Sequence, residues 1–135
     1  MNNSVLKLKS EKEATLSEIE KIVEEKLKKD SLYPTETVYN EITKVNDSSI
    51  LLMVFEKYYI RMGCRTSVVL QIEERDDTQF AVIIGTGGGS AVYGVNYGAY
   101  TEFVLKIEKI LHSIGFQITD RTGLAGDVYI APEDL

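Results

Sequence analysis

The sequence predicts an α+β fold in which an antiparallel sheet is packed by an N-terminal and a C-terminal helix. Amphipathic stretches lie towards the two ends of the chain, and three β-rich segments follow one another between residues 50 and 84. Because these expected strands are grouped and not separated by helices, they favour antiparallel pairing. The length of 135 residues, without internal repeats, predicts a single domain over residues 1–135.

The first expected element is an amphipathic helix over residues 10–29. Ser10 and Glu13 have the spacing of a capping box, in which a hydroxyl and a carboxylate bind free backbone N–H groups of the first turn. An apolar stripe follows, formed by Leu16, Ile19, Ile22, Val23 and Leu27.

Residues 35–45 fit two structures. Val38, Ile42 and Val45 recur at helical spacing, whereas Thr37, Val38 and Tyr39 are residue types that favour strands. We prefer a short helix that begins near Pro34, with a strand as the alternative. A turn is expected at residues 46–49.

Three strands are expected next, over residues 50–62, 68–73 and 80–84. The first is apolar on both faces at its start, which predicts a central strand covered on both sides, or covered on one side and buried in a dimer. Short polar linkers join the three segments, so the sequence predicts a meander.

The pattern changes after this meander. Residues 85–90 break the strand pattern, and residues 91–97 are expected to be extended. Residues 100–114 predict a helix because their apolar side chains share one face, and Gly115 predicts its C-terminal cap. Short strands are expected at residues 116–118 and 127–131, joined by residues 121–126.

Charge and composition argue against nucleic acid and membranes as partners. Lys plus Arg is 15 and Asp plus Glu is 21, a net charge of −6. Residues 1–30 carry seven of each sign, so the whole excess lies in the remainder and repels phosphate backbones. The longest apolar run, residues 50–55, is too short to span a bilayer. A single cysteine, Cys64, and the lack of a signal peptide favour the cytoplasm.

The glycine-rich run is the first candidate binding element. Gly87, Gly88, Gly89 and Ser90 could bring backbone N–H groups close to a phosphate. The run lacks the lysine of a nucleotide P-loop, and the next expected helix begins about ten residues later. A bulge, a crossover or the close approach of another chain is the alternative interpretation.

Tyrosines and an asparagine follow the glycines. Tyr93, Asn96 and Tyr97 offer flat apolar rings and polar tips, which suit sugar, aromatic or protein surfaces. Together with Gly87–Gly89 they would form the mouth of a pocket between the sheet and the helix that begins at Tyr100. Packing at the end of the sheet is the alternative.

Arg61 and Arg65 form the third candidate site. Two guanidinium groups beside Cys64 could lower the pKa of its thiol, or they could bind an anion. Pairing with acidic residues across turns is the alternative that we favour; the acids considered are Glu74, Asp76 and Asp77.

The sequence predicts no catalytic residue, metal site or cofactor. The only histidine, His112, is expected to be half exposed near a helix end, where it favours the helix dipole. One cysteine and one histidine cannot form a structural zinc site. The acids at residues 73–77 are read as a charged turn that protects a sheet edge.

One resemblance covers residues 54–104. Three segments carry it: Val54–Tyr59 followed by an arginine turn, Ile84–Gly89, and Tyr97–Ala99 before Phe103 and Val104. These residues resemble a family of small bacterial proteins of unknown function. The resemblance implies a bacterial cytoplasmic origin and no particular activity.

Three functions follow as hypotheses. The first is a non-catalytic binding or interaction module, whose partner is a second copy, through the sheet or the first helix, or another protein. The second is a small-molecule binder with the pocket described above. The third is an enzyme that uses Arg61, Arg65 and acidic residues.

Overall fold

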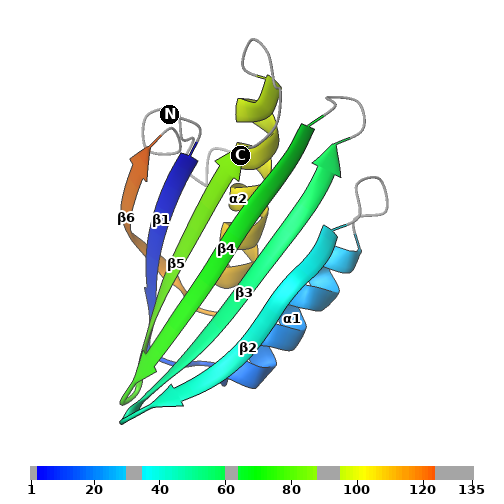
Figure 1. Ribbon diagram of the computed structural model, residues 1–135. Helices are drawn as coiled ribbons and strands as arrows, with labels where there is room; N and C mark the ends of the chain where they lie inside the picture. The colour runs from blue at the N-terminus through cyan, green and yellow to red at the C-terminus, as the bar shows by residue number, and fades with distance from the viewer. Residues whose placement is uncertain (1–2, 30–34, 60–63, 88–94, 124–135) are drawn as a thin grey trace.

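A computed structural model describes residues 3–29, 35–59, 64–87 and 95–123 (Figure 1). The elements in chain order are β1 (Asn3–Ser10), α1 (Leu16–Lys28), β2 (Thr35–Val45), β3 (Ser48–Tyr59), β4 (Cys64–Arg75), β5 (Thr78–Gly87), α2 (Val95–His112) and β6 (Gln117–Gly123). The expected α+β class is confirmed.

The strands form one six-stranded sheet in the order β2-β3-β4-β5-β1-β6. Every neighbouring pair is antiparallel. Strands β2 to β5 follow one another as a meander, so the expected meander is confirmed and extended by one strand. Strand β1 then lies between β5 and β6, so the first and last described strands pair with each other at the end of the sheet opposite β2.

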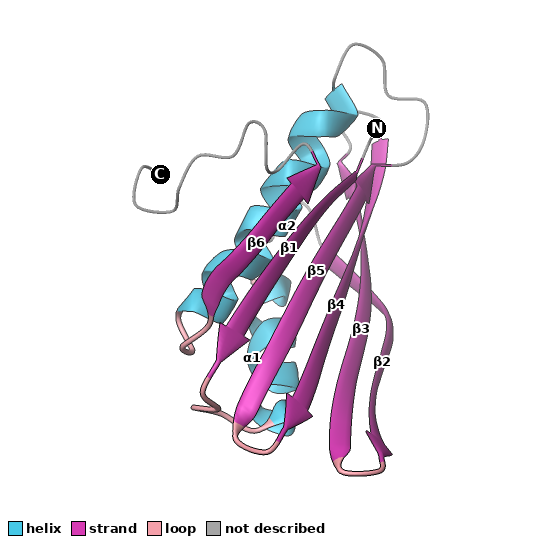
Figure 2. Cartoon of the chain, turned by 90° about the vertical axis from the view of Figure 1, so that its left-hand side faces the viewer, coloured by secondary structure: helices cyan, strands magenta, loops and turns pink. Residues whose placement is uncertain are grey.

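Helices α1 and α2 lie on the same side of the sheet (Figure 2). Strand side chains that point towards the helices alternate with side chains that point away, because successive residues of a strand face opposite sides. The helix-facing side chains form the core with the apolar stripes of both helices. Representative core residues, each fully buried, are Leu6, Leu51, Phe55, Leu70, Ile83 and Phe103.

The first helix begins later than the sequence suggested. Thr15 is its N-cap, and Thr15 and Glu18 form the capping box, not Ser10 and Glu13. Residues 3–10 form β1, a strand that the sequence reading missed. Its Leu6 and Leu8 are buried on the helix-facing side, whereas Lys7 and Lys9 are exposed on the other.

The preferred helix at residues 35–45 is wrong, and the alternative strand is correct. Strand β2 pairs with β3 along its whole length, with a bulge between Thr37 and Tyr39. Val38, Ile42 and Val45, which share helical spacing, are 51%, 39% and 47% exposed. Their spacing therefore does not mark a buried helical stripe. Asn46, with φ 55°, turns the chain into β3, as asparagine commonly does in a two-residue hairpin.

Three further boundaries differ from expectation. The glycines at 85 and 87 do not break β5 but pair within it, opposite Val68 and Thr66. Residues 95–97 are helical, not extended, because α2 begins at Val95. Residues 121–123 continue β6 and do not form a connector. Gly115 ends the helical region with φ 102°, as expected for a C-terminal cap, and residues 127–131 lie outside the described part.

Candidate functional site

The face of the sheet that points away from the helices, here called the open face, is covered by no described element. One row of apolar side chains crosses it, because Tyr39, Val54, Val69, Ile84 and Val5 are direct neighbours on five adjacent strands. Tyr39 is 44% exposed and the other four are half-buried. The open face of an antiparallel sheet is usually polar, so this row marks the face as unusual.

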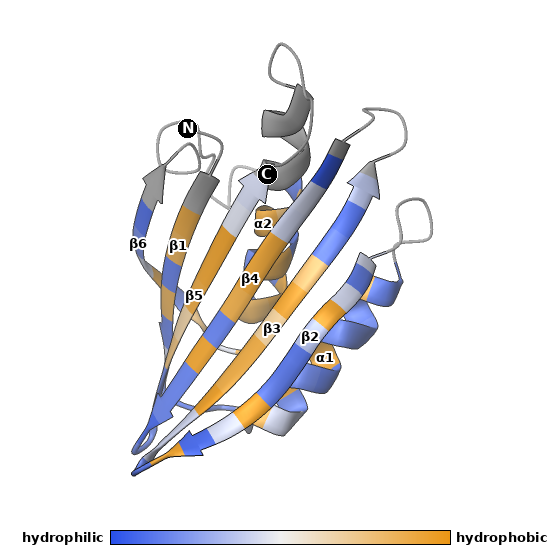
Figure 3. Cartoon of the chain, viewed as in Figure 1, coloured by the Kyte–Doolittle hydropathy of each residue, from blue (hydrophilic) through white to orange (hydrophobic). Residues whose placement is uncertain are grey.

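Two further rows extend the apolar area. Leu52 and Val82 flank Gln71 in one, and Ile50 and Phe80 flank Glu73 in the next. All four apolar side chains are half-buried. We call the set the open-face patch: Val5, Ile50, Leu52, Val54, Val69, Phe80, Val82 and Ile84. Figure 3 shows how apolar residues gather along β3, β4 and β5.

Charged residues pack against the end of the patch that lies at Phe80, next to the turn between β4 and β5. The Arg75 guanidinium lies 4.8 Å from the ring centre of Phe80 and Lys9 Nζ lies 6.0 Å from it. Arg75 also pairs with Glu73 at 3.2 Å. The two cationic groups therefore lie near the Phe80 ring at this end of the patch. Cations over an aromatic face make favourable cation–π interactions.

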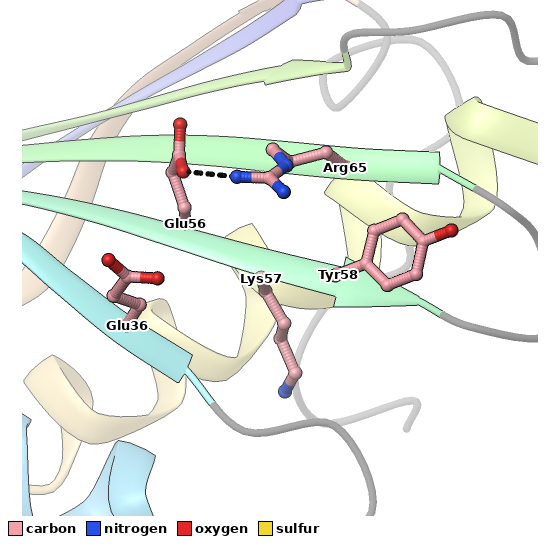
Figure 4. Close-up of a pocket in the computed structure, with 5 residues that line it drawn as sticks. All are labelled: Glu36, Glu56, Lys57, Tyr58 and Arg65. Atoms are coloured by element: carbon pink, nitrogen blue, oxygen red, sulfur yellow. Dashed lines mark hydrogen bonds and ion pairs between the residues drawn. The ribbon is translucent and has the colours of Figure 1, made fainter.

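The other end of the open face carries a small hollow at β2, β3 and β4 (Figure 4). Arg65 donates to Glu56 over 2.9 Å and its guanidinium lies 6.0 Å from the Tyr58 ring. Glu36 completes this corner, and the hollow measures about 90 Å³. Pockets for drug-sized molecules are several times larger, so this hollow does not hold an organic ligand of ordinary size.

Lys57 also borders the hollow, but its side chain lies on the other face of β3. It is buried, and its Nζ lies 5.5 Å from the ring centre of Phe103 in the core. Figure 4 shows its side chain on the opposite side of β3 from that of Glu56. Lys57 therefore joins the sheet to α2 and is not part of the open face.

The structure separates the residues that the sequence grouped around Arg65. Arg65 pairs with Glu56, and the expected pairing with Glu74, Asp76 or Asp77 is wrong for this arginine. Strand β4 spans Cys64–Arg75, which places Arg65 and the acidic turn at opposite ends of the sheet. Arg61 lies outside the described residues, as does the side chain of Cys64.

The candidate ligand loop falls largely outside the described part. Gly88, Gly89, Ser90 and Tyr93 are not described. Gly87 ends β5, while Asn96 and Tyr97 belong to the first turn of α2, with side chains outside the described part. The small-ligand pocket expected there stays a prediction.

A buried carboxylate was missed by the sequence reading. Glu108 is 1% exposed and lies 3.0 Å from His112 and 3.9 Å from Arg121. The i, i+4 spacing of Glu108 and His112 was the available signal. Because the pair and Arg121 connect α2 with β6, their contacts are structural. Within the described ranges, no group of three or more potential metal ligands converges.

A groove on the helical side has the opposite charge to the chain as a whole. Lys26 of α1 and Lys106 and Lys109 of α2 line a hollow of about 350 Å³ together with Ile110 and Ser113. It is open to solvent on the outer surface of the helices.

These features define the class of protein: an α+β protein whose described strands form an antiparallel sheet with two described helices on one face and an apolar patch on the other. The chain belongs to a family of unknown function, DUF6054, whose model matches residues 5–115. This confirms the expectation of a family of unknown function. Comparison with curated proteins finds no match. No helix in the described ranges is long and apolar enough to cross a membrane.

Proposed function

We propose that the protein is a non-catalytic interaction module that binds another polypeptide through the open face of its sheet, and that it acts in the cytoplasm. The open-face patch is the observation that supports this function. Its eight apolar side chains occupy adjacent positions on β3, β4, β5 and β1. Contiguous apolar surface of this kind on a folded chain is typical of protein–protein interfaces.

The composition of the patch also fits an interface. It combines aliphatic side chains with one phenylalanine, Phe80, at one end, and tyrosines, Tyr39 and Tyr58, lie at its rim. Charged residues lie around the patch, and an apolar core with a polar rim is the usual anatomy of a protein interface.

Site-directed photo-cross-linking tests the proposal in cells. A photo-reactive amino acid in place of Val69, at the middle of the patch, is expected to give one discrete cross-linked product with a second polypeptide. The same group in place of Lys21, exposed on α1, is the matched control and should give none. A second substitution in the patch, Leu52→Lys, should abolish the product from position 69.

Two outcomes would overturn the proposal. The first is equal cross-linking from positions 69 and 21, which would mean non-specific contact. The second is a cross-link within the same chain, for example to residues 124–135, which would mean that the chain itself covers the patch.

A further inference from the structure

The open-face patch accommodates a second copy of this chain, and we infer that two copies pack sheet against sheet. This inference rests on the proposed function and names the partner. The two-fold axis of the dimer runs parallel to the strands, between β4 and β5.

The size of the open face matches what a stable dimer needs. Six strands about 4.8 Å apart and about ten residues long at 3.4 Å per residue give a footprint of about 24 by 34 Å, or about 800 Å². A standard protein–protein interface buries about 800 Å² on each partner. The face is therefore large enough for a dimer without a contribution from the helices.

The apolar rows are self-complementary about this axis. A rotation of 180° about a line parallel to the strands exchanges the two halves of the sheet. It leaves the position of each residue along the strand direction unchanged. Strand β4 of one copy then faces β5 of the other, and β3 faces β1. Val69 accordingly meets Ile84 of the second copy, and Val54 meets Val5, because these residues share one cross-strand row.

The charges on the open face distinguish this axis from the alternative. Among described side chains, strands β2–β4 carry four Glu and two Arg there, so their balance is 2 − 4 = −2; the residues are Glu36, Glu41, Glu56, Glu73, Arg65 and Arg75. Strands β5, β1 and β6 carry Lys7, Lys9 and Asp120, a balance of 2 − 1 = +1.

A two-fold axis parallel to the strands therefore places the acidic half of one copy, taken as a whole, opposite the basic half of the other. Within single rows, Lys7 and Lys9 face Leu52 and Ile50 of the second copy, and Glu41 faces Asp120. An axis across the strands would place β2 on β2 and β1 on β1, with like charges opposed. Opposite potentials across an interface favour association, and like charges disfavour it.

Edge-to-edge pairing is the less suitable mode. Strand β2, one of the two edges of the sheet formed by the described strands, is interrupted by the bulge at Val38, and Glu36, Glu41 and Lys44 lie along it. Bulges and charged side chains are the usual devices that prevent a sheet edge from pairing with another chain.

Analytical ultracentrifugation and native mass spectrometry of the full chain test the inference. The wild-type protein is expected to be a dimer. Val69→Lys should dissociate it while the protein keeps its cooperative thermal transition, and Lys21→Glu, on the exposed side of α1, should leave it dimeric.

Two surface variants test the axis without touching the core. Lys7→Glu with Lys9→Glu makes both halves acidic, and Glu36→Lys with Glu41→Lys makes both halves basic. For each variant alone, the dissociation constant of the dimer should rise about tenfold or more. An equimolar mixture of the two variants should form a heterodimer. All four side chains are exposed, so these variants should fold.

The failures of the two proposals are distinguishable. A monomeric wild-type chain whose position 69 cross-links to a different polypeptide overturns the dimer and leaves the interaction module standing. A dimer that Val69→Lys leaves intact overturns the sheet-to-sheet dimer. A dimer sensitive to Val69→Lys but not to either charge variant overturns the proposed axis.

Discussion

The side chains of His112 and Glu108 meet across one turn of α2, where the ring Nε2 lies 3.0 Å from the carboxylate Oε2. The other ring nitrogen, Nδ1, lies 2.8 Å from the backbone carbonyl of Phe116, just before β6. Both partners accept hydrogen bonds, so both contacts form together when each ring nitrogen carries a hydrogen. His112 thereby links the end of α2 to the strand that follows it.

Replacing this histidine should destabilise the fold. His112→Ala is expected to lower the free energy of unfolding by about 1–3 kcal/mol, because the buried Glu108 carboxylate loses a partner. Urea unfolding followed by circular dichroism measures the difference. Lys109→Ala, exposed on the same helix, is the control and should stay within about 0.5 kcal/mol of wild type. Equal effects of the two substitutions would contradict the structural role of His112.

The capping box of α1 predicts two separable effects. Glu18 N–H donates to the Thr15 hydroxyl at 3.1 Å, and Thr15 N–H donates to the Glu18 carboxylate at 2.9 Å. Thr15→Ala should reduce the free energy of unfolding by about 1 kcal/mol, which thermal or urea unfolding will measure. Ser17→Ala, exposed in the first turn beside the cap, is the matched control. An equal loss in both variants would argue against the cap.

Glu18 adds a dependence on pH. The hydrogen bond from the Thr15 backbone, followed by the bond with its side chain, holds the pKa of Glu18 below its ordinary value of 4.5. The folded state therefore favours the ionised carboxylate, and its contribution to stability is present above pH 4.5 and is lost as pH falls through the lowered pKa. Glu18→Gln should flatten this part of the melting-temperature profile, whereas Glu25→Gln, outside the cap, should not. Identical acid profiles for wild type and Glu18→Gln would contradict the effect.

The sequence predicted the class and the central strands because their local patterns agree with their final environment. It failed at β2, where Val38 and Ile42 have helical spacing in a strand whose pairing with β3 decides its structure. Propensity is a weak guide for an edge strand, because cross-strand contacts override it. Strand β1 was missed although Leu6 and Leu8 alternate with lysines, since a short run beside a charged helix gives a weak signal.

The open-face patch was only partly visible in the sequence. The apolar stretch at the start of β3 indicated a strand with two apolar faces. The contribution of β3 to the patch could therefore be predicted from the sequence. The remainder depends on register: Val5 lies beside Ile84 although 79 positions separate them in the chain. No local pattern specifies such a pairing, because one residue of slip would exchange the two faces.

Gly115, the C-terminal cap of the α2 region, offers a last test. With φ 102°, Gly115 occupies a backbone conformation that side chains disfavour, and a Cβ added there would lie 2.0 Å from Glu13 Oε2. Glu13 is exposed and its carboxylate is the far end of a flexible side chain, so it can move away at little cost. The backbone strain cannot be relieved in this way. Gly115→Ala should therefore cost about 1–2 kcal/mol of unfolding free energy.

A double-mutant cycle separates the two causes. If the strain dominates, Gly115→Ala should cost the same in the wild-type and Glu13→Ala backgrounds, to within about 0.5 kcal/mol by urea unfolding. A cost that disappears in the Glu13→Ala background would show that the contact with Glu13, and not the left-handed conformation, requires glycine at this position.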